Sequence, residues 1–268
     1  MIDSVLEMLS YPFMVKALIA GPLIALCLSL LGVGMVLKRY SMIGDGLSHV
    51  SFGALAVASA LHMQPLVVGI PVVMISAVLL LRVSEKSKVS GDSAIALIST
   101  AALAIGVTAV SATKGMNVDV WNYLFGSILS LKNSDVWITA ALAILTVSIF
   151  VMYYARIFAC TFDENFVSAI GIKVKRYNLM MAIITSLVII IGMRMVGSLL
   201  ISSLIVFPSV SAMRVAKSFK KVVIFSALIA VFCTLAGIVV SYYANTPTGA
   251  SIVLGNLIVL ILLSLFRR

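Results

Sequence analysis

Long apolar runs separated by short charged connections constrain this chain more than any other feature of its sequence. The runs are about 15 to 27 residues long, which suits helices that cross the hydrocarbon core of a bilayer. Hydrophobic residues make up 62% of the 268 residues and charged residues 10%, with a mean hydropathy of +1.21. A soluble domain of ordinary composition does not approach these values. The runs also lack the short alternation of an outer-membrane barrel, so the sequence predicts an all-α polytopic membrane protein.

We expect about eight to nine transmembrane helices in one domain that covers residues 1–268. The count is eight if one of the shorter runs is re-entrant. The expected spans are 17–37, 42–61, 66–81, 94–112, 136–154, 179–193, 196–212, 222–243 and 248–266.

Clusters of Lys and Arg indicate the orientation of these spans. The net charge is +10, and the basic clusters all fall on one side if every run crosses once. Because cytoplasmic loops collect Lys and Arg, we expect the N-terminus outside and the C-terminus in the cytoplasm. Such a charge in a soluble protein would suggest nucleic acid, but here it is explained by orientation, so no nucleic-acid partner is predicted. The clusters lie at 38–39, 82–88, 156–176, 214–221 and 267–268.

The most unusual stretch is SMIGDGLSHVS at 41–51, where Asp45 and His49 stand four residues apart in an otherwise apolar run. This spacing returns to the same helix face, so both side chains can address one cation. An Asp in hydrocarbon costs about 2.5 to 3.5 kcal/mol on insertion scales, so we expect something to offset that cost. The competing interpretation is that Asp45 caps the helix and His49 packs against a neighbour. Three glycines flank the pair and would allow close approach of a backbone or an ion: Gly44, Gly46 and Gly53.

One Asp and one His do not complete a coordination sphere, since a dehydrated cation takes about four or more ligands. A C2 homodimer with this helix at its axis would bring two copies of the pair together. Mixed carboxylate and imidazole ligands suit Zn²⁺, Mn²⁺ or Fe²⁺ and disfavour Cu⁺. We predict Asp45 and His49 as metal ligands for a transported ion, and His62, near the outer end of the same span, as a secondary ligand, although a solvated His is the more common case.

Two polar segments stand out, and the first of them is a candidate for contact with a cytoplasmic partner. Pro208 is expected to end a span, and the following residues resemble a short basic amphipathic helix, which is either a docking helix or a solvated loop. In the second segment, 161–178, Asp163 is a predicted N-cap and Gly171 a predicted left-handed stop, with no chemistry expected of the short helix between them. The predicted docking residues are Pro208, Ser209, Ser211, Ala212, Arg214, Lys217 and Lys220.

The sequence carries no motif for catalysis or for ATP hydrolysis. HExxH, GxSxG and the GxxxxGK[ST] phosphate loop are absent, so we expect no enzyme and a separate source of energy. The three cysteines have no CxxC spacing and are expected to pack in the bundle without a tightly bound cofactor.

Several stretches, in order along nearly the whole chain, resemble the permease subunits of the zinc/manganese/iron class of bacterial ABC importers, distant relatives of the vitamin B12 and siderophore permeases. The resemblance implies a type II importer fold, a homodimer in the bacterial cytoplasmic membrane, two cytoplasmic ABC ATPase subunits and an extracytoplasmic metal-binding protein. It also implies that Asp45 and His49 form the cation site and that the segment after Pro208 is the coupling helix. The matching stretches are 42–58, 91–107, 123–129, 162–174, 196–216 and 242–254.

Two other functions remain compatible with the same residues. A carrier driven by a proton or sodium gradient could use the Asp/His pair as its coupling site, but it would not need a docking helix. A permease for a metal chelate such as a siderophore would need a wider and less ionic path. The sequence does not distinguish zinc from manganese or ferrous iron as the transported ion.

Overall fold

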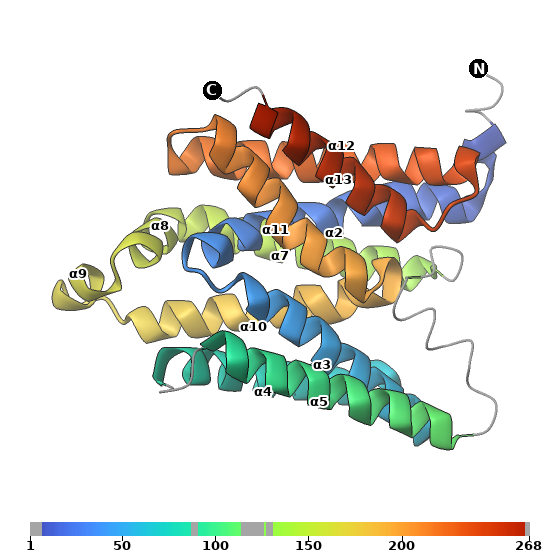
Figure 1. Ribbon diagram of the computed structural model, residues 1–268, viewed down its shortest axis with the longest axis horizontal. Helices are drawn as coiled ribbons and strands as arrows, with labels where there is room; N and C mark the ends of the chain where they lie inside the picture. The colour runs from blue at the N-terminus through green and yellow to red at the C-terminus, as the bar shows by residue number, and fades with distance from the viewer. Residues whose placement is uncertain (1–6, 87–90, 114–125, 127–130, 266–268) are drawn as a thin grey trace.

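The computed structural model describes residues 7–86, 91–113, 126 and 131–265, and these ranges contain helices and no strands (Figure 1). The principal helices are α2 (Pro12–Leu37), α3 (Ser41–Ala60), α4 (Pro65–Lys86), α5 (Gly91–Ala112), α7 (Asn133–Met152), α8 (Tyr154–Phe162), α9 (Glu164–Ala169), α10 (Val174–Val196), α11 (Ser198–Val215), α12 (Phe219–Ala244) and α13 (Thr248–Leu265).

Helix length and composition support the predicted membrane architecture. Seven of the described helices, α2, α4, α5, α7, α10, α12 and α13, are long and apolar enough to cross a bilayer. Helices α3 and α11 have 20 and 18 residues, so they are long enough to cross as well. The prediction of an all-α polytopic fold is confirmed, and the number of helices fits the expected eight to nine spans. The expected 113–135 loop lies largely outside the described residues.

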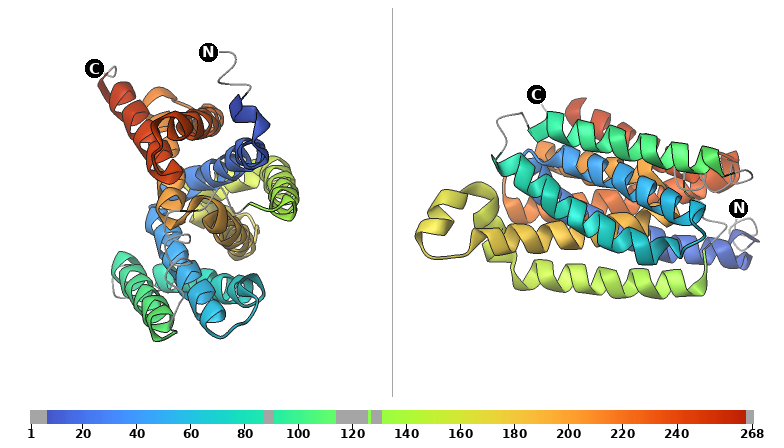
Figure 2. Two further views of the ribbon diagram at one scale, coloured as in Figure 1. Left: turned by 90° about the vertical axis from the view of Figure 1, so that its right-hand side faces the viewer. Right: turned by 90° about the horizontal axis from the view of Figure 1, so that it is seen from below.

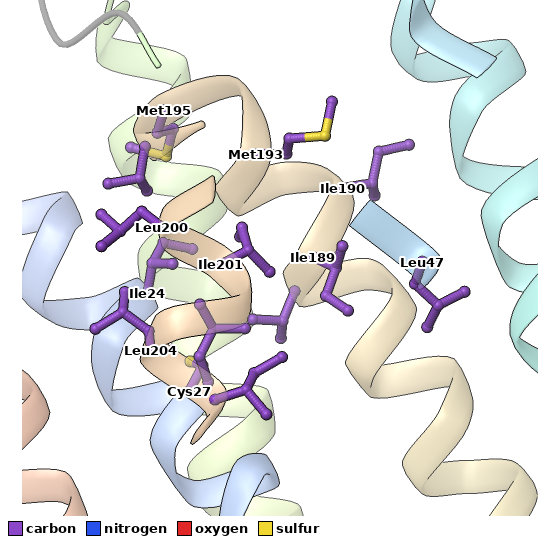
Figure 3. Close-up of a cluster of buried hydrophobic side chains, with 14 of the residues drawn as sticks. Ile24, Cys27, Leu47, Ile189, Ile190, Met193, Met195, Leu200, Ile201 and Leu204 are labelled. Atoms are coloured by element: carbon purple, nitrogen blue, oxygen red, sulfur yellow. The ribbon is translucent and has the colours of Figure 1, made fainter. Parts of the chain in front are cut away.

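The long helices run roughly along one axis, and the start of α2 and the end of α13 lie toward opposite ends of the bundle (Figure 1). Seen end-on, α3, α4 and α5 gather on one side and α12 and α13 on the other, with α2, α10 and α11 between them (Figure 2). Buried side chains of these central helices meet in the core, among them Ile24, Ile189 and Ile201 (Figure 3). Burial in this core fixes α11 against α2 and α10, next to α3.

Helix α3 approaches α5 closely because both helices lack side chains at the crossing. A Cβ added to Gly53 would lie 2.5 Å from the carbonyl oxygen of Ala102, and one added to Gly106 would lie 2.9 Å from the Cα of Gly53. Small residues that let two backbones approach are typical of packed membrane helices. The expectation that the glycines around the Asp/His pair allow close backbone approach is confirmed at Gly53.

Helices α8 and α9 form a corner that extends from one end of the bundle (Figures 1 and 2). The Asp163 carboxylate accepts a 2.9 Å hydrogen bond from the Phe166 N–H, and Gly171 has φ +85°. The predicted cap, short helix and glycine stop are therefore confirmed. Phe219, at the start of α12, contacts the rings of Phe158 and Phe162, which places the α11–α12 turn beside α8.

The prediction that Pro208 ends a span is wrong. Helix α11 continues through this proline to Val215, and α12 begins four residues later at Phe219. No separate amphipathic helix exists at 209–221. A proline removes one backbone hydrogen bond, but packing by neighbouring helices keeps such a helix intact. Here Pro208 and Ser209 are buried, and the Ser209 hydroxyl donates to the Ile205 carbonyl.

Candidate functional site

Asp45 and His49 lie on the same face of α3, as the four-residue spacing predicts. His49 Nε2 is 3.6 Å from Asp45 Oδ2, within ion-pair reach but beyond a good hydrogen bond. The alternative that Asp45 caps this helix is wrong, because α3 begins at Ser41 and Asp45 stands in its second turn. Its carboxylate therefore does not serve the free N–H groups of the first turn and is available for another partner.

That partner is Ser202 on α11, a residue for which no role was predicted. The Ser202 hydroxyl donates a 2.8 Å hydrogen bond to Asp45 Oδ1, which leaves Oδ2 facing His49. The contact joins residues 157 positions apart in the chain, so no local sequence pattern indicates it. The structure thus holds the carboxylate in one orientation by a contact between two spanning helices.

The two donor atoms are spaced as a bound cation would need. Zinc ligands lie about 2.0 to 2.2 Å from the metal, so two neighbouring donors of a tetrahedral site are about 3.4 Å apart. The separation of 3.6 Å between His49 Nε2 and Asp45 Oδ2 is close to that distance. The two side chains are 28% and 43% exposed, so the pair lies in an accessible position and not in the sealed core.

The other ring nitrogen of His49, Nδ1, is buried without a hydrogen-bond partner. Buried polar atoms are usually paired, so such an atom calls for an explanation. Nε2, which faces Asp45, is the ring nitrogen in position to contribute its lone pair to a cation.

One protomer offers an incomplete ligand set. Among the described residues, no group of three or more His, Cys, Asp and Glu side chains is arranged to hold a metal ion. His62 lies 13 residues beyond His49, which is about 20 Å along a helix, and is exposed past the end of α3 with φ +55°. The structure therefore separates His62 from the Asp45/His49 pair.

The residues predicted to dock a cytoplasmic partner divide into two groups. Ser209, Ser211 and Ala212 are completely buried within the protomer, so their small side chains serve helix packing and offer no surface to a partner. Three basic residues are exposed: Arg214, Lys217 and Lys220. They flank the turn between α11 and α12.

A more prominent surface, which we call the α9 corner, consists of the exposed residues Phe162, Phe166, Ile170 and Lys173. The side chains of Phe162, Phe166 and Ile170 are 60%, 61% and 57% exposed, respectively. Phe162 contacts Phe219, so this corner is continuous with the basic α11–α12 turn. No docking role was predicted for residues 161–178, although apolar residues outside the expected spans can indicate an interaction surface.

Comparison with known proteins gives one family for the whole bundle. Residues 10–267 match the model of the ABC 3 transport family. The manganese transport system membrane protein MntC of Halalkalibacterium halodurans is 28% identical over 248 residues, which cover 92% of this chain and 85% of MntC. The high-affinity zinc uptake system membrane protein ZnuB of Haemophilus influenzae is 26% identical over 258 residues, covering 96% and 98% of the two chains.

A solved structure has the same fold. PsaBC from Streptococcus pneumoniae in complex with Fab superposes with a TM-score of 0.88 at 24% identity, over 98% of this chain and 95% of the PsaBC chain. The resemblance found in the sequence is confirmed by the family match, which extends over nearly every residue described above. The chain belongs to the ABC 3 transport family.

Proposed function

We propose that this protein is the permease subunit of an ATP-driven importer of divalent transition-metal ions. The observation that carries the proposal is the accessible pair Asp45 and His49, oriented by Ser202 and spaced 3.6 Å between donor atoms. Placing an ionisable pair on a helix of a membrane bundle costs free energy. Such pairs commonly mark an ion or substrate path. Membership of the ABC 3 transport family supplies the context in which such a pair serves transport.

The candidate ligands and the names of the relatives together favour zinc or manganese as the transported ion. One carboxylate and one imidazole suit Zn²⁺, Mn²⁺ and Fe²⁺. The relatives MntC and ZnuB are named for manganese and zinc, respectively. The ion is cargo in this proposal, and the permease carries no resident cofactor.

A homodimer completes the site. Two ligand side chains from each of two protomers give four, which is the number that a tetrahedral cation takes. A two-fold axis beside α3 is the simplest arrangement that brings two copies together. The partial exposure of Asp45 and His49 in one protomer agrees with a position at such an interface.

ATP hydrolysis belongs to a separate cytoplasmic subunit, and an extracytoplasmic metal-binding protein delivers the ion. For the ATPase we propose docking at the α9 corner together with Arg214, Lys217 and Lys220. This surface extends from the end of the bundle that also contains the basic α11–α12 turn, and Lys and Arg accumulate on the cytoplasmic side of membrane proteins. Its exposed aromatic and aliphatic residues are of the kind that fill pockets on a partner.

The proposal is tested by metal uptake in the reconstituted complex of permease and ATPase. Asp45→Ala and His49→Ala should abolish uptake of Zn²⁺ and Mn²⁺ and leave expression and ATPase association intact. Full uptake by both variants would exclude the site. Ser29→Ala, a buried serine of α2 whose hydroxyl donates to the Leu26 carbonyl of its own helix, is a matched control that should transport normally.

The same preparation distinguishes the competing functions. Uptake driven by an ion gradient without ATP would identify a secondary carrier. Binding of free Zn²⁺ or Mn²⁺ to the purified dimer supports ion transport, whereas transport of a chelate alone would identify a chelate permease.

A further inference from the structure

A hydrogen-bonded group of three side chains joins α9 to the end of α2 and to α10, the helices that precede α3 and α11 in the chain. Lys38 Nζ donates to Glu164 Oε1 at 2.6 Å and to Asn178 Oδ1 at 2.7 Å. Asn178 Nδ2 donates to the same Glu164 oxygen at 3.2 Å. The three residues belong to the end of α2, the start of α9 and the first turns of α10, respectively.

Two of the three members are shielded from solvent. The Lys38 side chain is 15% exposed and Asn178 is 7% exposed, while Glu164 on α9 is 40% exposed. Ion pairs that are shielded in this way are screened less by salt than surface pairs, and charge-assisted hydrogen bonds are the stronger kind. The group therefore holds α9 against α2 and α10 more firmly than a surface contact would.

Lys38 is joined to the metal site by a short and tight connection. Lys38, Arg39 and Tyr40 form the whole link between α2 and α3, with Arg39 at φ +61°. The Tyr40 N–H donates to the Met35 carbonyl, and the Ile43 N–H donates to Tyr40. Asp45 follows seven residues after Lys38, and only Arg39 and Tyr40 separate Lys38 from the start of α3, so a displacement of Lys38 is passed through this link to the first turns of α3.

Asn178 begins a second route to the same site. It lies in the first turns of α10, which runs to Gly197 at φ +86° and continues as α11, the helix of Ser202. Glu164 thus contacts Lys38, which opens the link into α3, and Asn178 of α10, which leads through Gly197 into α11; α3 and α11 meet at the Asp45–Ser202 hydrogen bond.

The surroundings leave room for this group to rearrange. A cavity of about 70 Å³ lies beside it, lined by residues of α2, α3, α8 and α10 that include Lys38, Asn178 and Ile43. Packed cores resist small displacements, so an unfilled volume at a contact between helices is where a shift meets least resistance.

We propose that Lys38, Glu164 and Asn178 form the mechanical link that transmits ATPase movement at the α9 corner to the ion site. Glu164 moves with α9, Lys38 carries the displacement into α3, and Asn178 carries it into α10 and α11. The inference rests on the proposed transport function and assigns positioning roles to three residues that touch no ion. Breaking the link uncouples ATP hydrolysis from transport without removing the metal ligands.

The experiment measures the number of metal ions transported per ATP hydrolysed by the permease–ATPase complex in proteoliposomes, with Mn²⁺ as the probe. Lys38→Met and Glu164→Gln should each lower this ratio severalfold, because each removes a charge from the hydrogen-bonded group. Equilibrium binding of Mn²⁺ to the purified permease and co-purification of the ATPase should stay as in the wild type. Lys175→Met, which removes one exposed charge from the first turn of α10, is the matched control and should keep the wild-type ratio.

The exchange variant Lys38→Glu with Glu164→Lys provides the rescue. Asn178 can turn its amide to donate to a carboxylate at 38 and accept from an ammonium at 164, so the exchanged pair should recover coupling. A wild-type ratio in both single variants would overturn the link, as would loss of Mn²⁺ binding or of ATPase association in Lys38→Met. If Lys38→Met does not fold, Glu164→Gln, altered at a more exposed site, decides alone. Absence of Mn²⁺ transport by the wild-type complex would instead contradict the proposed function.

Discussion

The hydroxyl of Ser202 on α11 donates a 2.8 Å hydrogen bond to the carboxylate of Asp45 on α3. The bond fixes which oxygen of Asp45 faces His49 and joins the two helices that carry the proposed ion site and its hydrogen-bond donor. An outer hydrogen bond of this kind typically orients a metal ligand and tunes its affinity.

Removal of this hydroxyl should weaken ion binding. Ser202→Ala is expected to lower the affinity for Zn²⁺ or Mn²⁺ about tenfold, because the carboxylate loses its orienting donor. Equilibrium binding to the purified permease measures the change. The neighbouring variant Ser203→Ala is the control, since the Ser203 hydroxyl donates to the Leu200 carbonyl within its own helix. An unchanged affinity in Ser202→Ala would show that Asp45 needs no such support.

The close crossing of α3 and α5 should not tolerate a methyl group. Gly53→Ala places a Cβ 2.5 Å from the Ala102 carbonyl oxygen, so we expect a loss of about 1 to 3 kcal/mol in the free energy of unfolding. Thermal unfolding in detergent measures it. Gly34→Ala on α2 is the matched change, because its nearest atom would be the Thr161 hydroxyl at 3.9 Å. Equal melting temperatures for the two variants would contradict the crossing.

The exposed ring of Phe166 should contribute to ATPase association. Phe166→Ser is expected to cost about 2 kcal/mol of binding free energy, roughly a 30-fold weaker complex, as for an aromatic residue at the centre of an interface. Titration of the purified permease with its ATPase measures the affinity. Trp137→Ser removes a still more exposed ring, 76% accessible, at the start of α7, and should leave association unchanged. A larger loss of ATPase affinity from Arg214→Ala than from Phe166→Ser would indicate that docking is centred on the α11–α12 turn.

Buried Ser209 should affect stability and leave docking intact. Its hydroxyl lies between the Ile205 carbonyl and the Ser226 hydroxyl, at 2.8 and 3.4 Å, and its side chain has no exposed surface. Ser209→Leu therefore overpacks the α11–α12 contact and should cost about 1 to 3 kcal/mol in unfolding free energy. The folded fraction should still bind the ATPase with wild-type affinity. Loss of ATPase binding without loss of stability would indicate that Ser209 belongs to the docking surface. Arg214→Leu, at an exposed position, should leave stability nearly unchanged.

The spans could be predicted from sequence because each depends on local composition. An apolar run of sufficient length can satisfy its backbone only as a helix in lipid, whatever its neighbours are. Asp163 and Gly171 were predictable for a similar reason, since a cap and a left-handed stop act within a few residues.

Other features depend on contacts between distant segments, which composition does not encode. The prediction that a span ends at Pro208 was wrong because packing against neighbouring helices keeps α11 helical through this buried proline. The small residues after it were ambiguous, since Ser209 and Ala212 suit a partner surface and a helix crossing equally well. Ser202 escaped prediction because its partner is 157 residues away. The pairing of Asp45 with His49 was predictable only because it occurs within one helical turn.

The incomplete ligand set on α3 has a consequence for the assembly of the subunit. If Asp45 and His49 are the metal ligands, a single chain supplies two donors and should bind a cation more weakly than the proposed homodimer with four. In the proposed homodimer, pairing of two chains would therefore create the capacity to hold the ion.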